Sequence, residues 1–142
     1  MADIEIDGHS LTIEAAISVA NGYNTAILSD SARSRMEESR KGVEKIIQSG
    51  EVVYGINTGF GAMSSVRISA DDLEQLQTNL IKSHACGVGD LMDPQHVLLM
   101  MVFRANSLAK GVSGIRPEIV DLLLNMVNNG IAPVIPRIGS LG

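Results

Sequence analysis

The fold is decided by residues 93–109, which read DPQHVLLMMVFRANSLA. Asp93 and Pro94 predict a helix start, because an aspartate caps the first turn and a proline at the first helical position needs no hydrogen bond for its nitrogen. Apolar side chains then cover most of the circumference of the predicted helix, namely Val97, Leu98, Met101, Val102, Ala105, Leu108 and Ala109. A helix that is apolar on nearly every side belongs in the middle of a bundle.

Further helices are predicted on both sides of this stretch. Apolar residues recur at helical spacing over residues 12–20, 30–48, 70–84 and 117–128. Two prolines within residues 131–136 exclude both a helix and a central strand, so that segment is expected to be extended.

The first dozen residues are predicted to form a small β-hairpin. Ile4 and Ile6 alternate with polar residues, and Asp7-Gly8 is a favoured two-residue turn. The predicted fold class is therefore mainly α, with a β-hairpin at the N-terminus and long loops. No repeat or linker divides the chain, so residues 1–142 are expected to form a single segment.

The composition argues against several classes of protein. The 142 residues are 45% hydrophobic and carry a formal net charge of −5, so neither nucleic acid nor a membrane surface is an expected partner. No apolar run approaches the roughly 18 residues of a membrane span, and residues 1–5 lack the positive charge of a signal peptide, so a cytoplasmic location is expected. A single Cys86 and three separated histidines predict neither a disulfide framework nor a structural zinc site.

A glycine-rich segment is the first candidate for function. Gly55, Gly59 and Gly61 lie within seven residues, and glycines at this density cost backbone entropy on folding. The segment is either a structural turn or a loop that faces a ligand. Tyr54 ends a short extended run predicted over residues 52–54, and it is either a packed strand residue or a catalytic phenol, although an unperturbed phenol is a poor base at neutral pH.

His84 is the second candidate. It follows Leu76 and Leu80 on the apolar stripe of the helix predicted over residues 70–84. Such a histidine is either a hydrogen-bonded core residue or a ligand contact. Cys86 lies two residues further on and is expected to be a small, buried packing residue.

Four blocks of sequence resemble, in their order and spacing, the N-terminal part of the aromatic amino acid ammonia-lyases. They are VYGINTGFG at residues 53–61, LQTNLIKSHACGVG at residues 76–89, GVSGIR at residues 111–116 and PVIPRIGSLG at residues 133–142. The resemblance covers essentially the whole chain, and it is strongest to the histidine-specific members of that family.

The resemblance implies part of an ammonia-lyase or aspartase-like helical-bundle subunit, which assembles with the remainder of its own chain into a homotetramer. It also implies an electrophilic methylidene-imidazolone, formed autocatalytically from an Ala-Ser-Gly triad, and no dissociable cofactor. In the family this triad follows a string similar to residues 139–142, and no Ala-Ser-Gly occurs in the sequence. We therefore expect the triad directly after Gly142, and we expect the 142 residues alone to be inactive.

The resemblance assigns roles to single residues as well. Tyr54 matches the family's tyrosine that removes a proton from the carbon next to the amine-bearing carbon, and backbone N–H groups of the glycine-rich loop are expected to stabilise its phenolate. Ser83 and His84 match the pair that contacts the side chain of the substrate. Gly61 is expected to bind the substrate too.

Three functions remain open on these grounds. The leading hypothesis is the non-oxidative deamination of L-histidine to urocanate and ammonia. A tyrosine ammonia-lyase or tyrosine 2,3-aminomutase is the second, because the Ser83-His84 pair also resembles some aminomutases and an imidazole can contact either a histidine ring or a phenol. The third is a non-catalytic helical module that uses the same scaffold for assembly.

Overall fold

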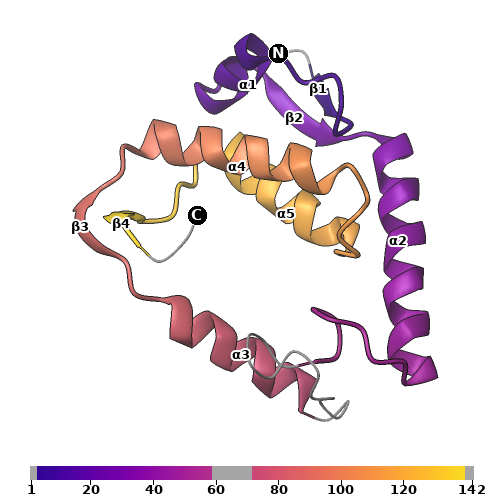
Figure 1. The fold of residues 1–142 in the computed structure, drawn as a ribbon. Coiled ribbons are helices and arrows are strands. Elements are labelled where there is room, and N and C mark those ends of the chain that lie inside the picture. The colour runs from indigo at the N-terminus through magenta and orange to yellow at the C-terminus, as the bar shows by residue number, and fades with distance from the viewer. Residues whose placement is uncertain (1–2, 59–71, 140–142) are drawn as a thin grey trace. The chain divides into compact units, whose positions relative to one another are not determined.

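The computed structural model describes residues 3–58 and 72–139, and helices dominate these ranges. The elements are β1 (Asp3–Ile6), α1 (Ile13–Ala20), β2 (Thr25–Leu28), α2 (Asp30–Ser49), α3 (Leu73–His84), β3 (Val88–Leu91), α4 (Pro94–Leu108), α5 (Pro117–Asn128) and β4 (Pro136–Ile138) (Figure 1). The mainly helical fold class is confirmed, and α1, α2, α4 and α5 lie where the sequence predicts them. In the part of the chain that the structure describes, no helix has both the length and the apolar character needed to cross a bilayer.

The chain forms two compact units. The first comprises Met1–Lys41 and Leu91–Ile135, and it contains β1, α1, β2, α4 and α5. The second comprises Gly42–Asp90 and Pro136–Gly142, and it contains α3, β4 and most of β3. Helix α2 begins in the first unit and ends in the second.

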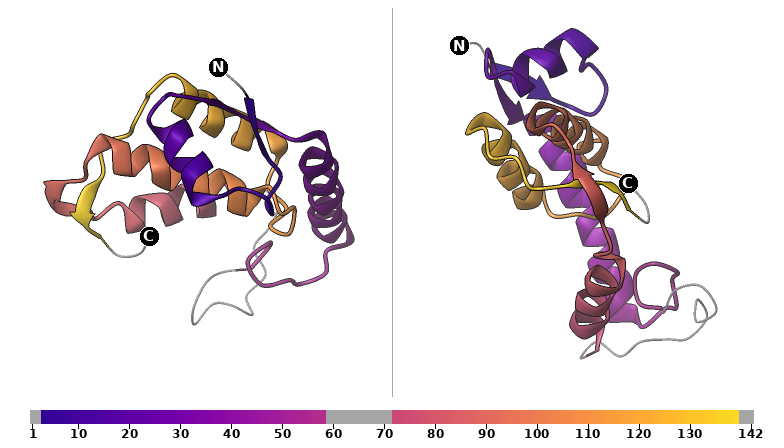
Figure 2. Two further views of the ribbon diagram at one scale, coloured as in Figure 1. Left: turned by 90° about the horizontal axis from the view of Figure 1, so that it is seen from above. Right: turned by 90° about the vertical axis from the view of Figure 1, so that its left-hand side faces the viewer.

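The predicted N-terminal hairpin is wrong, because β1 pairs with β2 in parallel. Asp3 lies opposite Thr25 and Ile6 lies opposite Leu28, and α1 connects the two strands (Figure 2). Asp7 does not turn the chain back on itself. Its carboxylate accepts hydrogen bonds of 2.8 Å from the backbone N–H groups two and three residues later, which leads the chain towards α1.

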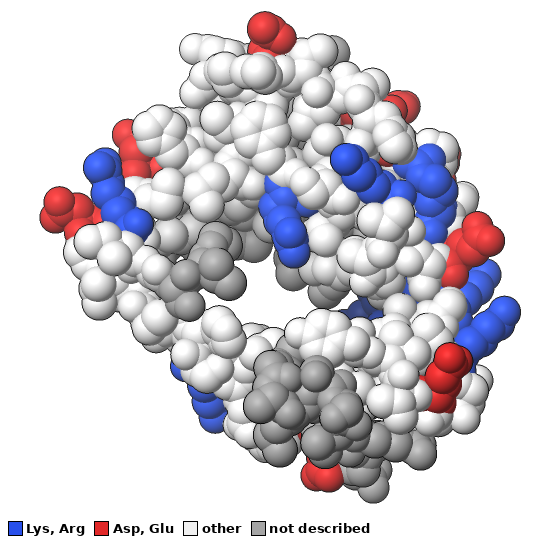
Figure 3. Space-filling view, viewed as in Figure 1, with Lys and Arg blue, Asp and Glu red and all other residues white. Residues whose placement is uncertain are grey.

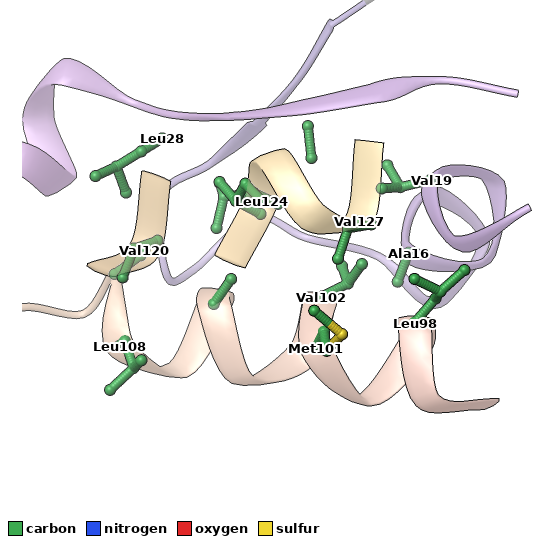
Figure 4. Packing of buried hydrophobic residues seen from close by; sticks show 14 of the residues in the cluster. Ala16, Val19, Leu28, Leu98, Met101, Val102, Leu108, Val120, Leu124 and Val127 are labelled. Carbon is green, nitrogen blue, oxygen red and sulfur yellow. The ribbon is translucent and has the colours of Figure 1, made fainter. Parts of the chain in front are cut away.

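The hydrophobic core of the first unit is built around α4, as the sequence predicts. Val102 and Ala105 are completely buried, and α4 packs against both α1 and α5. Figure 4 shows the α4 side chains facing Val120, Leu124 and Val127 of α5, with Ala16 and Val19 of α1 close by. Burial on several sides explains why this helix has so few polar residues.

Polar bonds tie the residues after β1 to two helices of the same unit. The Asn106 side chain of α4 accepts a hydrogen bond of 3.0 Å from the backbone N–H of Gly8. The Arg35 guanidinium of α2 donates to the carbonyl oxygen of Asp7 at 2.6 Å and to that of Ala109 at 3.3 Å. A charged donor on two carbonyl groups makes a strong junction.

The segment that precedes β4 is not helical, as its prolines predict. Residues 131–135 form neither helix nor strand, and Pro136 is the first residue of β4, where a missing N–H is tolerated. The pairing of β3 with β4 makes a second two-stranded sheet.

Gly8 lies close to the backbone just after α4, and replacing this glycine tests whether the close approach contributes to stability. Gly8 has φ +87°, and an added Cβ atom would lie 2.7 Å from the backbone nitrogen of Lys110. Gly22 is the matched control, because its φ of +75° is similar and nothing lies within 4 Å of an added Cβ. We expect Gly22→Ala to cost about 1 kcal/mol through backbone strain, and Gly8→Ala to cost about 1–3 kcal/mol more through the clash.

Thermal and urea unfolding of the two variants in the full-length protein measures this difference. Equal losses of stability in the two variants would show that the chain relaxes around Gly8 and that the close approach is not a constraint.

Candidate functional site

Three of the four predicted site residues are described, and all three lie in the second unit. Ser83 and His84 are brought together at the C-terminal end of α3. Tyr54 lies on a separate segment, in the turn that follows α2. Gly61 lies outside the described residues.

Tyr54 occupies the corner of a tight turn. The backbone N–H of Ile56 donates to the carbonyl oxygen of Val53 at 3.1 Å, and Gly55 has φ +79°. This is the geometry of a type II turn, which needs a positive φ at its third position and therefore favours glycine there. Tyr54 is 64% exposed and lies in a turn, so it is not the packed strand residue that was one of the two roles open from the sequence.

Asn57 holds this turn from inside. Its side chain is only 4% exposed, its Oδ1 accepts from the backbone N–H of Val53 at 2.9 Å, and its Nδ2 donates to the carbonyl oxygen of Glu51 at 2.7 Å. An amide can serve as donor and acceptor at once, which few other side chains of this size can do. These two bonds satisfy backbone groups of Glu51 and Val53 within the turn itself. They hold the backbone on the N-terminal side of Tyr54 in place.

The sequence analysis did not single out Asn57. The available signal was an asparagine two residues after a glycine at the start of a glycine-rich loop, a position where asparagine commonly bonds to nearby backbone.

His84 is held by the last turn of its own helix. Its Nδ1 lies 2.8 Å from the carbonyl oxygen of Leu80 and 3.0 Å from Ser83 Oγ, and that hydroxyl donates to the same carbonyl at 2.8 Å. Both side chains are exposed. Within its unit His84 is therefore not a core residue, and it can be contacted by another molecule.

Cys86 differs from the prediction. It is exposed and unpaired rather than buried, because it follows α3 in the short connection to β3, where its backbone N–H donates to the carbonyl oxygen of His84 at 2.9 Å. Among the described residues, no cluster of three or more His, Cys, Asp and Glu side chains could hold a metal ion.

A pocket in the first unit contains none of the predicted site residues. Part of its polar lining is bonded internally, since Arg33 Nη2 bonds both carboxylate oxygens of Asp121 at 2.7 and 3.0 Å. The Asn128 side chain bonds the backbone N–H and the carbonyl of Ala26, both at 2.9 Å. The contact with Asp121 raises the pKa of Arg33 above its ordinary value. We assign no chemistry to this pocket.

Charged side chains are interspersed on the face shown in Figure 3. Lysine and arginine side chains (blue) and aspartate and glutamate side chains (red) are both visible among its described residues. The predicted site residues that the structure describes thus offer an exposed phenol at a turn and an exposed imidazole and hydroxyl at a helix end.

The sequence profile of the aromatic amino acid lyases matches residues 11–142. Among curated proteins, the chain is 49% identical over all of its 142 residues to a histidine ammonia-lyase from Caldanaerobacter subterraneus subsp. tengcongensis. A histidine ammonia-lyase from Alkaliphilus metalliredigens is 47% identical over the same length. The chain spans 28% of the length of each of these relatives.

Solved structures of similar fold include enzymes of two kinds. A histidine ammonia-lyase from Trypanosoma cruzi is 39% identical, with a TM-score of 0.86 over 99% of this chain and 27% of its own. A tyrosine aminomutase from Streptomyces globisporus is 36% identical, with a TM-score of 0.90 over 97% of this chain and 26% of its own.

The two side-chain bonds of Asn57 predict a local loss of order when they are removed. We expect Asn57→Ala to cost about 1–3 kcal/mol, because it leaves the N–H of Val53 and the carbonyl of Glu51 without these partners. Asn79→Ala is the control, since Asn79 makes an exposed bond of 2.8 Å to Gln75, and its loss should cost well under 1 kcal/mol. Urea unfolding and hydrogen exchange of the peptide over residues 51–57 measure both effects.

Faster exchange confined to residues 51–57 in the Asn57 variant is the expected signature. If the two variants lose equal stability and exchange at the same rates, Asn57 does not hold the turn.

Proposed function

Because the chain belongs to the aromatic amino acid lyase family, we propose that the protein deaminates L-histidine without oxidation, giving urocanate and ammonia. The observation that carries this proposal is 46–50% identity to curated histidine ammonia-lyases over 96–100% of the chain. The 142 residues supply part of the site, with one base and one contact for the substrate ring.

Tyr54 is the proposed base. Deamination of an amino acid requires a group that removes a weakly acidic proton from the carbon next to the amine-bearing carbon. The phenol of Tyr54 is exposed, and its backbone is fixed by the turn at Gly55 and by the bonds of Asn57. A base on a fixed backbone loses little conformational freedom when the substrate binds, which favours proton transfer in a defined direction.

Ser83 and His84 form the proposed contact for the substrate ring, and Gly61 is proposed to bind the substrate from the glycine-rich loop. The imidazole of His84 is exposed at the end of α3 and is oriented by its bond to Leu80. A hydrogen-bonding group against the ring gives selectivity, because a ring without a matching polar atom leaves that group unpaired.

The amine of the substrate is a poor leaving group, and its loss requires a prosthetic group that the 142 residues do not themselves contain. A methylidene-imidazolone supplies an electrophile that bonds the substrate amine and makes it able to leave. No Ala-Ser-Gly occurs in the 142 residues, and we propose that the group forms from such a triad directly after Gly142, with no dissociable cofactor. The exposed side chains of Tyr54, Ser83 and His84 fit this arrangement, since a substrate held elsewhere in the protein can reach them.

We further propose that the protein is a cytoplasmic homotetramer and that the rest of its own chain covers the apolar surface of the first unit. Phe103 is 41% exposed, Leu122 is 57% exposed and Val134 is 76% exposed. Large apolar side chains left in water favour a partner that buries them.

A second candidate is a tyrosine ammonia-lyase or a tyrosine aminomutase. The solved tyrosine aminomutase from Streptomyces globisporus, which matches 97% of the chain with a TM-score of 0.90, favours this alternative. The two candidates differ in their products. Histidine gives urocanate, whereas tyrosine gives coumarate from a lyase and a β-amino acid from an aminomutase.

Replacement of Tyr54 tests the proposed base. In the full-length protein, Tyr54→Phe should lower kcat for histidine by about 10²–10⁴-fold, the range for loss of a general base, with a smaller change in KM. The control is Tyr23→Phe, because Tyr23 is the other tyrosine within residues 1–142 and is similarly exposed, at 71%. Urocanate absorbance and released ammonia measure the rate.

Kinetics that match for the two variants would remove Tyr54 from the mechanism. A wild-type protein that releases ammonia from tyrosine and not from histidine would replace the leading function by the second candidate. Release from neither would favour the non-catalytic module.

A further inference from the structure

Two asparagines of the first unit are each followed by a glycine at the end of a helix. Asn21 follows α1 and Asn129 follows α5, and both pairs read Asn-Gly in the sequence. An asparagine before a glycine is open to a reaction within the chain, in which the backbone nitrogen of the glycine attacks the side-chain carbonyl carbon. Glycine favours this reaction because it has no side chain to hinder the approach of its own nitrogen.

The reaction exchanges one carbon–nitrogen bond for another. The backbone nitrogen bonds Cγ of the asparagine, and the bond from Cγ to the side-chain nitrogen breaks. That nitrogen takes up the proton given by the backbone nitrogen and leaves as ammonia. Water then opens the resulting five-membered imide at either carbonyl, which gives aspartate or isoaspartate.

The backbones of the two helix ends are alike. Asn21 has φ −85° and ψ 0°, and Asn129 has φ −99° and ψ 7°. In each turn the glycine has a positive φ, and its N–H donates at 2.9 Å to the carbonyl oxygen of Val19 or Val127. The residue after each glycine donates to the carbonyl five positions earlier, at 3.0 and 2.9 Å, which completes a Schellman motif at both helix ends.

Both motifs must open before the reaction can occur. At these ψ angles the glycine nitrogen is turned away from the β-carbon of the asparagine, beside which it must lie to close the ring. Its N–H is also held in a hydrogen bond. Helix ends open more readily than helix interiors, so both sites are reachable. The geometry of the cap does not distinguish one site from the other.

The side chains of the two asparagines differ. Asn129 Nδ2 donates to the backbone carbonyl of Asn125 at 2.8 Å and lies 2.9 Å from Oδ1 of the same residue. The side chain of Asn21 is exposed and makes no hydrogen bond within the described residues. A side-chain bond across this first turn, from Ser18 to Asn24 at 2.5 Å, does not involve the Asn21 amide. The leaving nitrogen is thus held at position 129 and unrestrained at position 21.

We propose that Asn21 is a site of spontaneous deamidation and that the bonds to Asn125 protect Asn129 from the same reaction. The proposal is independent of the proposed function. Aspartate at position 21 places a negative charge at the C-terminal end of α1, where the helix dipole disfavours it. Isoaspartate also adds a carbon atom to the backbone between α1 and β2, and the register of β2 with β1 depends on that connection.

Ageing of the full-length protein in mildly alkaline buffer measures both rates at once. Mass spectrometry of its proteolytic peptides detects the replacement of an amide by a carboxylate and separates aspartate from isoaspartate. In the folded protein Asn21 should convert about tenfold faster than Asn129, because reaction at Asn129 also breaks two hydrogen bonds. In urea the two rates should become similar, since neither the caps nor these bonds remain.

Three variants test where the difference comes from. Asn125→Ala should raise the rate at Asn129 about 2- to 10-fold and leave Asn21 unchanged, because it removes the Oδ1 partner and keeps the backbone carbonyl. Asn79→Ala, which removes an exposed bond to Gln75 on α3, is the control and should change neither rate. Asn21→Gln should remain intact, because glutamine would have to form a larger ring, and its melting temperature should not fall on ageing as that of the wild type does.

Several results would contradict the proposal. Equal rates at the two sites in the folded protein, or no conversion of Asn21, would overturn it. A difference that persists unchanged in urea would arise from neighbouring residues in the sequence rather than from the fold. An unchanged rate at Asn129 in Asn125→Ala would reject the protection, and an unchanged melting temperature of the deamidated wild type would reject the effect on α1.

Discussion

The burial of α4 on several sides is the constraint on which the first unit depends. A helix with Val102 and Ala105 at zero exposure needs neighbours around most of its circumference, and α1 and α5 supply two of them. Because β1 and β2 flank α1 in sequence, docking α1 on α4 also fixes where the small sheet lies. Asn106 and Arg35 add hydrogen bonds to the backbone of Gly8 and Asp7. Because hydrogen bonds are directional and apolar contacts are not, these bonds specify how the segment after β1 lies against the helices.

Elements with a strong local signal in the sequence lie where that signal predicts them. The apolar pattern of α4 favours one kind of structure, and the prolines at positions 133 and 136 exclude a helix there, so both features were predicted correctly. The Asp7-Gly8 pair was misleading because two structures use it: a two-residue hairpin turn, and a loop in which the carboxylate bonds to following N–H groups. The choice between them depends on Gly8 meeting α4, more than 90 residues away, and no local pattern contains that contact.

In the candidate site, too, some features have a local signal in the sequence and others depend on the folded structure. Tyr54 and His84 were candidates from the residues themselves, and the resemblance added Ser83 and assigned the roles. The structure adds what a sequence cannot contain, namely exposure and hydrogen-bond partners. Asn57 was missed because its importance lies in burial, and a short polar side chain in a glycine-rich loop gives no sign of being buried. The expectation of a buried Cys86 failed for the converse reason, since a small apolar residue beside a helix end can lie on either side of the surface.

The amide of Asn128 has a consequence for how the chain behaves among other copies of itself. A two-stranded sheet leaves both of its outer strand edges open, and open edges are sites where chains add to one another as extra strands. By bonding both the N–H and the carbonyl of Ala26, Asn128 occupies one of the backbone positions that a third strand would use on β2. A single side chain of α5 thus covers, in the folded unit, a backbone position at which another extended chain could pair.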